Sequence, residues 1–209
     1  MKTLISFSII LCSILGFGQE KFEQNTLFGT KKPSIRGYVS LNAKTIELNN
    51  QIGLLTGAEA TLVLNHKFNI GFYGQALLNN VMSSYTDVNS NLYHYEMAQA
   101  GIKLTPTLFS KRTIHLTFPV ELGLGGLSIN RYRFFDINTF ESNSWNDVYD
   151  YDWFAYVEPG IRAEINLFKH LRLSGGLGYT LTDPVILTST TSKPIDGLNA
   201  NLSLKVGWF

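Results

Sequence analysis

Hydrophobic and polar residues alternate strictly along much of the chain, most clearly over residues 153–182. In the first half of this stretch, Val157 and Ile161 fall on one face, whereas Glu158 and Arg162 fall on the other. Side chains of a β-strand point to opposite faces in turn, so a period of two predicts strands. We therefore expect a hairpin whose two strands are about twice as long as a usual globular strand.

The same alternation extends from Ser34 to the end of the chain and predicts eight strands. The expected strands are residues 35–45, 52–65, 68–79, 93–105, 113–127, the two strands of the 153–182 hairpin, and 198–209. One face of each strand is apolar, and the other carries glycines and charges that are typical of a narrow polar interior. The sequence thus predicts an all-β fold, a closed eight-stranded antiparallel transmembrane β-barrel with lipid outside.

The connections between the expected strands alternate in length, which is typical of outer-membrane barrels. Three are short, and the longer ones are residues 46–51, 80–92, 128–152 and 183–197. Short periplasmic turns and longer surface loops would place both termini on the periplasmic side. Pro119 and Pro159 fall inside expected strands. Because proline lacks a ladder donor, we expect a bulge or a local kink at each.

The N-terminal residues have the features of a secretory signal peptide: Lys2, a mostly apolar segment, and a small residue at Gly18. We expect cleavage after Gly18, a periplasmic lead-in over residues 19–33 and a barrel over residues 34–209. A retained anchor is the alternative, but the apolar run is short for a membrane span. The single cysteine lies in the signal, so the mature chain has no thiol chemistry. A net charge of +1 gives no reason to expect nucleic acid as a partner.

Several segments resemble known outer-membrane proteins. The segments are LLTGAEA at 54–60, LNHKFNIG at 64–71, VEPG at 157–160 and INLF at 165–168. They resemble a family of uncharacterised outer-membrane β-barrel proteins from the Bacteroidetes, small OmpA-like barrels. The resemblance implies fold and location, and it supplies no activity. The ending at Trp208 and Phe209 resembles the signal that the barrel-assembly machinery reads, although Phe209 is out of step with the outward face.

The inward faces collect charges of both signs. The residues of this expected lumen ion-pair network are Arg36, Lys44, Glu59, Lys103, His115, Glu121, Glu158, Arg162, Glu164, Arg172 and Lys205. An eight-stranded barrel is just wide enough for side chains to fill its interior, and buried charges must be paired. We therefore expect a structural network that plugs the barrel; a narrow gated path for ions or protons is the alternative.

The longest connection, residues 128–152, mixes aromatic residues with acids. The candidates for surface interaction are Tyr132, Phe134, Phe135, Asp136, Trp145, Asp147, Tyr149 and Asp150. Aromatic residues are enriched at interfaces, and they also form the girdle at the lipid headgroups. The segment is thus expected to supply girdle aromatics, with a ligand or partner surface as the alternative. Its carboxylates could bind calcium, but their spacing does not match an EF-hand.

No motif predicts a cofactor, a metal site or a catalytic centre, so we expect a protein that is not an enzyme. A lipid-modifying enzyme remains an alternative, with His115, Thr117 and Glu121, or His170 with Ser174, as its candidates. A secreted lipocalin-like binder is another. The leading hypothesis is a monomeric outer-membrane barrel with a structural or surface-interaction role. Its expected partners are outer-membrane lipid, the barrel-assembly machinery and an extracellular ligand or protein.

Overall fold

The protein is described by a computed structural model that covers residues 34–86, 92–110, 112–131, 148–187, 190 and 193–209. The expectations for residues 1–33, namely the signal peptide, its cleavage after Gly18 and the lead-in, lie outside the described residues. Within the described part, no helix is long and apolar enough to cross a membrane.

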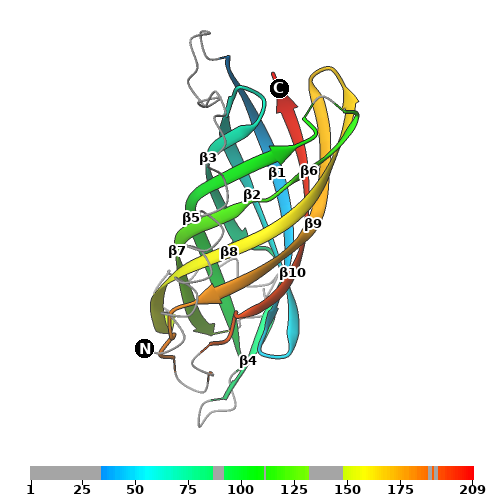
Figure 1. The fold of residues 1–209 in the computed structure, drawn as a ribbon. Coiled ribbons are helices and arrows are strands. Elements are labelled where there is room, and N and C mark those ends of the chain that lie inside the picture. The colour runs from blue at the N-terminus through cyan, green and yellow to red at the C-terminus, as the bar shows by residue number, and fades with distance from the viewer. Residues whose placement is uncertain (1–33, 87–91, 111, 132–147, 188–189, 191–192) are drawn as a thin grey trace, which may run out of the picture. The chain divides into compact units, whose positions relative to one another are not determined.

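Ten strands make up this part of the chain (Figure 1). They are β1 (Ile35–Leu48), β2 (Gln51–Leu64), β3 (Phe68–Leu77), β4 (Val81–Thr86), β5 (Leu92–Leu108), β6 (Ile114–Thr117), β7 (Val120–Arg131), β8 (Val148–Phe168), β9 (Leu171–Thr182) and β10 (Gly197–Gly207).

The strands close into a ring of eight. Antiparallel pairing runs from β1 through β2, β3, β5, β7, β8, β9 and β10, and β10 pairs with β1 again. The two additional strands are extensions, because β4 pairs with β5 beyond the end of β3, and β6 precedes β7 between the same neighbours. The predicted fold, a closed eight-stranded antiparallel barrel, is confirmed.

The two ends of the barrel differ in their connections. At one end, which we call the turn end, lie the turn at 65–67, the turn at 169–170 and the C-terminal residue Phe209 (upper part of Figure 1). The opposite end, which we call the loop end, carries β4 and the connections that follow β7 and β9. The expected segregation of long connections to one end is therefore largely present.

One expected loop is wrong. Residues 46–51 are not a longer segment, because β1 continues to Leu48 and β2 begins at Gln51. The intervening Asn49 and Asn50 both adopt positive φ, 53° and 58°. Asparagine tolerates this left-handed conformation, and two such residues make the tight turn that matches the twist of a hairpin. The Asn-Asn pair was the signal for a two-residue turn.

Of the bulge or local kink expected at each proline, the structure shows no bulge at either one. Pro119 interrupts the strand between β6 and β7, but both pieces keep one register against β8, with Thr117 opposite Arg162 and Val120 opposite Pro159. Its carbonyl still accepts a hydrogen bond from the Gly160 backbone N–H at 2.8 Å. The ladder therefore loses a local donor without gaining an extra residue.

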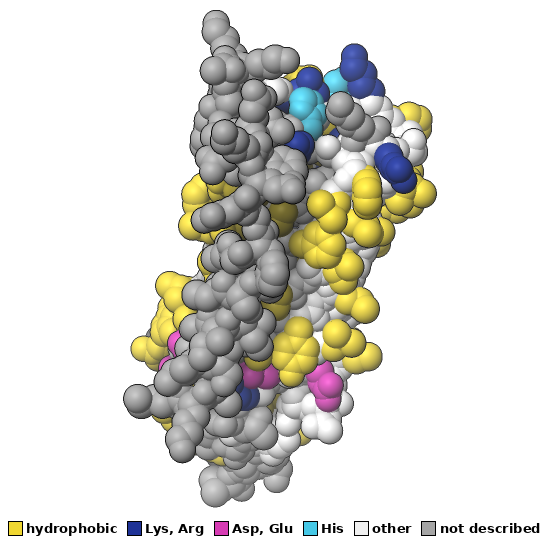
Figure 2. Space-filling view, in the orientation of Figure 1, with side chains coloured by type: hydrophobic (Ala, Val, Ile, Leu, Met, Phe, Trp, Pro, Cys, Tyr) yellow, Lys and Arg dark blue, Asp and Glu magenta, His cyan; other side chains and the backbone are white. Residues whose placement is uncertain are grey.

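The apolar faces point outward, as predicted. Outward residues remain strongly exposed, for example Leu41 at 69%, Phe72 at 67% and Leu124 at 65%. Figure 2 shows hydrophobic side chains over the middle of the visible wall, with charged side chains nearer its two ends. On the inward face of β7, glycines admit large rings, because a Cβ at Gly125 would lie 2.3 Å from the ring of Phe154. The interior is thus packed against the strands.

Candidate functional site

Glu121 lies at the centre of the charged interior. Its carboxylate is 2.8 Å from the Arg162 guanidinium, 3.0 Å from the Lys103 ammonium and 3.5 Å from that of Lys44. Lys44 also contacts Glu158 at 2.7 Å. These side chains come from four different strands, β1, β5, β7 and β8, and all are at most 6% exposed. The cluster therefore ties opposite walls of the barrel together.

Hydroxyl groups complete this cluster. Glu59 pairs with Lys103 and accepts hydrogen bonds from the hydroxyls of Tyr38, at 3.1 Å, and Thr61. Glu158 accepts one from Thr180 at 2.8 Å. Such bonds fill the remaining acceptor sites of buried carboxylates, which lowers the cost of removing them from water. Sequence reasoning assigned the ions but missed these hydroxyl partners, which share the inward phase of the same strands.

A second cluster lies toward the turn end around Glu164. This carboxylate contacts Lys205, His115 at 3.1 Å and Arg172 at 3.9 Å. Arg36 is placed apart from both clusters, because it is exposed and donates to a main-chain oxygen of Phe209. All other predicted network residues contact another member of the network, His115 through its ring nitrogen and the rest in ion pairs.

The charged interior leaves almost no free space. Where Lys44, Tyr73, Lys103, Glu121 and Arg162 meet, the cavity measures about 10 Å³. That is barely room for a single water molecule. Within the described residues, the paired ions therefore leave little room at this level of the barrel.

Toward the loop end the interior is apolar, which the sequence reasoning did not anticipate. The inward residues here include Leu48 and Leu55, both fully buried, and Ile129. The connection between β9 and β10 adds Val185 and Ile195, each 2% exposed, to the same cluster. The signal was present in the sequence, because Leu55 shares the inward phase of Glu59 along one strand.

Asp196 anchors this connection. Its carboxylate accepts hydrogen bonds from the backbone N–H and hydroxyl of Thr182, at 2.7 and 2.6 Å, and pairs with Lys193 at 3.1 Å. Burial acts to raise the pKa of Asp196, but the Thr182 hydrogen bonds and the Lys193 ammonium outweigh it and hold the pKa below its usual range. The segment that closes the loop end is thus fixed at its base.

Three tyrosines stack at the loop end. The ring of Tyr149 lies 4.4 Å from that of Tyr85 and 5.5 Å from that of Tyr93. Tyr149 stays 47% exposed, and Asp150 follows it in β8. The other predicted surface-interaction residues, Tyr132, Phe134, Phe135, Asp136, Trp145 and Asp147, lie outside the described residues.

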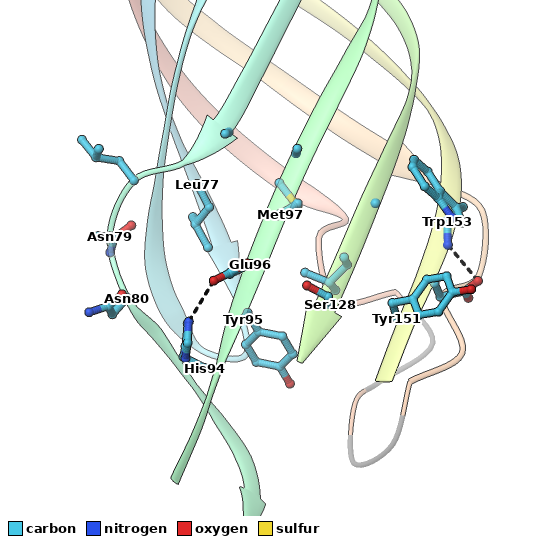
Figure 3. A pocket seen from close by; sticks show the side chains of 16 residues that line it. Leu77, Asn79, Asn80, His94, Tyr95, Glu96, Met97, Ser128, Tyr151 and Trp153 are labelled. Carbon is cyan, nitrogen blue, oxygen red and sulfur yellow. Dashed lines mark hydrogen bonds and ion pairs between the residues drawn. The ribbon is translucent and has the colours of Figure 1, made fainter. Parts of the chain in front are cut away.

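A shallow pocket of about 460 Å³ opens on the outer wall near the loop end (Figure 3). It lies between the strand ends that carry Asn79, His94 and Trp153, and His94 contacts Glu96 across 3.3 Å. Tyr151 and Trp153 are 66% and 69% exposed beside it. Exposed Trp and Tyr next to an apolar band are the pattern of the aromatic girdle, which the sequence predicted for the segment 128–152 that contains Tyr151.

The two residues of the expected assembly signal face opposite ways. Trp208 is 68% exposed, whereas Phe209 is 9% exposed and lies 5.3 Å from the ring of Tyr38. The guanidinium of Arg172 lies 3.8 Å from the centroid of the Phe209 ring. Phe209 thus closes the turn end of the lumen, consistent with its being out of step with the outward series.

The candidates for nucleophilic chemistry are kept apart or enclosed. His115 is 1% exposed and contacts Glu164 in the interior, where Thr117 is fully buried beside it. His170 is exposed at the rim and contacts the Gly207 carbonyl, whereas Ser174 is 1% exposed inside the barrel. A nucleophile and its base must lie within hydrogen-bond reach of each other and of a substrate. Neither candidate set meets both conditions.

Comparison with solved structures agrees with this architecture. Neisserial surface protein A (NspA) aligns with 85% of this chain and 99% of its own, at a TM-score of 0.51 and 10% identity. A major outer membrane protein from Thermus thermophilus aligns with 82% of this chain and 99% of its own, at a TM-score of 0.50 and 10% identity. The chain has the fold of an eight-stranded outer-membrane β-barrel.

Sequence comparison does not identify a family for this chain. No protein-family model matches the chain, and no curated protein matches it. The resemblance to a Bacteroidetes family therefore stays a prediction. At 10% identity the structural likeness concerns the fold alone.

Proposed function

We propose that this chain is an outer-membrane protein with a closed lumen, which acts structurally or as a surface-interaction protein through its loop end. The wall supports a membrane location. Large apolar side chains such as Leu41, Phe72 and Leu124 are exposed on several strands. Soluble monomers rarely expose contiguous apolar surfaces of this kind, whereas a barrel in lipid must.

The filled lumen is the observation that carries the proposal. A cavity of only about 10 Å³ between the paired ions at the centre leaves no volume at that level for a solute or a small-molecule ligand. This argues against the transport and lipocalin-like alternatives, which need a path or an apolar interior pocket. The candidate catalytic sets argue against a lipid-modifying enzyme, because His115 and Thr117 are enclosed among buried ions. What remains open to partners is the surface outside the packed middle of the lumen, including its two ends.

The loop end offers the better interaction surface of the two ends. The stacked Tyr85, Tyr93 and Tyr149 lie at this end in β4, β5 and β8, and of these strands β8 follows the 132–147 segment. Tyrosine gives large contact area at a low entropy cost, and it is enriched at binding hot spots. We place this end outside the cell and the termini in the periplasm, after removal of the signal peptide.

Location is tested by gel mobility of the outer-membrane fraction, unboiled against boiled. We expect a band that runs fast when unboiled and slows on boiling, because a closed barrel resists detergent until heated. Soluble protein in the periplasm or medium, with no such band in the membrane fraction, would contradict the proposal.

Orientation is tested by adding proteinase K to intact cells. We expect cleavage within residues 132–147 and protection of the barrel. Cleavage that needs permeabilised cells would place the loop end in the periplasm. Deleting residues 138–147 should preserve the heat-dependent mobility shift, because the ring of eight strands already closes among the described residues.

A further inference from the structure

The turn end of the barrel is strongly basic. Figure 2 shows Lys, Arg and His side chains gathered at the upper end of the molecule, which is the turn end. The basic residues and histidines are Arg36, His66, Lys67, Arg112, Lys169, His170 and Arg172. The described residues of this end, 34–37, 64–68, 106–110, 112–114, 166–172 and 206–209, include no Asp or Glu side chain, and only Arg36 among the basic residues is engaged by a main-chain oxygen of Phe209. An anion near this end therefore meets an attractive field from several sides.

Part of this charge surrounds a cavity at the mouth of the lumen. The cavity measures about 390 Å³ and is lined by residues that include Arg36, Lys169, His170, Arg172 and Phe209. We call it the basic vestibule. Phe209 and Arg172 both line it, and the Arg172 guanidinium carbon lies 3.8 Å from the centroid of the Phe209 ring, which is a cation–π contact.

Arg172 is incompletely neutralised. The carboxylate nearest to it in an ion pair is Glu164 at 3.9 Å, and this group is shared with Lys205 and with His115. The Arg172 Nε is buried and has no hydrogen-bond partner within the described part of the chain. Arg162 Nε, deeper in the lumen, is buried and unpartnered in the same way, so this atom alone does not indicate a ligand. The Arg172 side chain as a whole is 17% exposed, and an anion in the vestibule would meet the positive charge of its guanidinium.

We propose that the basic vestibule binds a phosphate group. Guanidinium groups present a planar fork that matches phosphate oxygens, and Lys169 adds a point charge at the edge. Two sources share this chemistry, an anionic phospholipid headgroup and a soluble phosphate ester. Trp208 and Phe168, 68% and 73% exposed beside the vestibule, offer apolar contact to acyl chains. The lipid source rests on the proposed function, because it requires the barrel to lie in a bilayer.

Calorimetric titration of the full-length protein in a neutral detergent tests the proposal. The probes are short-chain phosphatidylglycerol and, separately, glycerol 3-phosphate. Both should bind, and binding should weaken as ionic strength rises. Arg172→Gln should weaken binding about tenfold and Lys169→Gln about threefold, since a charge-assisted contact is stronger when it is bidentate and partly buried. Tighter binding of the lipid than of glycerol 3-phosphate identifies a headgroup as the source, and equal affinities identify a soluble ester.

Lys67→Gln is the matched control. Lys67 is exposed at the same end but does not line the vestibule, so its loss should leave both affinities unchanged. If Lys67→Gln weakened binding as much as Arg172→Gln, the attraction would be a general surface charge and the proposal would fail. It would also fail if neither probe bound. Lys169 is exposed, so its variant should fold even if Arg172→Gln does not.

The outcome is separable from that of the proposed function. If the protein bound phosphate but was absent from the outer membrane, the vestibule proposal would stand and the proposed membrane location would fail. If the protein was a heat-modifiable barrel in the outer membrane but bound neither probe, the proposed location would stand and the vestibule proposal would fail.

Discussion

The lumen has two halves that are filled by different means. In the half nearer the turn end, Glu121 and Glu164 each hold three basic partners, and a small apolar cluster of Tyr38, Val63 and Phe209 lies at its outer end. In the half nearer the loop end, Leu55, Leu127 and Ile129 pack with residues from the connection between β9 and β10. The same strands build both halves, so the two halves differ in which residues occupy the inward-facing positions.

The two halves of the lumen differ in how strictly their side chains must match one another. Apolar packing is non-directional and tolerates substitutions of similar volume. Paired ions need exact partners, because an unpaired charge in a dry interior is costly. Removing one charge from the polar half should therefore cost more than removing several methyl groups from the apolar half.

The largest effect is expected from Glu121→Gln. The change leaves Arg162, Lys103 and Lys44 with one carboxylate fewer, which should reduce the free energy of unfolding by about 3–5 kcal/mol. Urea unfolding in detergent micelles, followed by tryptophan fluorescence, measures it. Glu96→Gln is the control, because Glu96 is exposed on the outer wall, and it should change little.

A double variant sharpens this result. Arg162→Gln should cost less in the Glu121→Gln background than in the wild type, because it then removes an unpaired charge. Equal costs in the two backgrounds would show that the two side chains do not act as a pair.

Leu127→Ala probes the apolar half and should have the next largest effect. Leu127 is 1% exposed, and its truncation should leave a cavity that lowers the free energy of unfolding by about 2–4 kcal/mol. Leu124→Ala, on the outer face of the same strand and 65% exposed, should cost less than about 1 kcal/mol in the same assay. Equal losses for the two variants would show that the apolar half is loosely packed.

Tyr149→Ala tests the tyrosine stack at the loop end of the apolar half. Its ring contacts with Tyr85 and Tyr93 are partly exposed, so we expect a loss of about 0.5–1.5 kcal/mol. Tyr149→Phe keeps the ring and should unfold like the wild type. If Tyr149→Phe lost as much stability as Tyr149→Ala, the contribution would come from the hydroxyl group and not from the stacked rings.

Asp196→Asn should give the smallest effect, and one that depends on pH. Because the pKa of Asp196 is lower in the folded than in the unfolded chain, ionisation stabilises the fold above the unfolded value of about 3.9. This contribution is lost as pH falls through the folded pKa. The wild type should therefore exceed the variant in stability at neutral pH, and the difference should vanish in acid. If the difference in stability persisted in acid, it would come from the altered hydrogen-bond geometry of the asparagine and not from the charge of Asp196.

Much of this fold could be predicted from the sequence, because a barrel in lipid imposes a strict period of two on every strand. The phase that put Val157 outward and Glu158 inward was correct along the whole hairpin. The same phase placed Glu121, Lys103 and Arg162 inside, and their mutual contacts followed from the narrow diameter.

Other features could not be predicted from the two-residue alternation of hydrophobic and polar positions alone. The two-residue turn at Asn49 and Asn50 depends on the backbone tolerance of asparagine. The apolar half depends on strands that extend beyond the expected boundaries and on Val185, which comes from a segment without alternation. The absence of a bulge at Pro119 depends on its carbonyl keeping the neighbouring strand in register.

The central claim is that the lumen is closed, and planar-bilayer recording of the purified barrel tests it most directly. With paired ions around a cavity of about 10 Å³, we predict no stepwise current above the leak of the membrane. Reproducible unitary steps from the wild-type protein would contradict the account and would favour a gated ion path through the charged half.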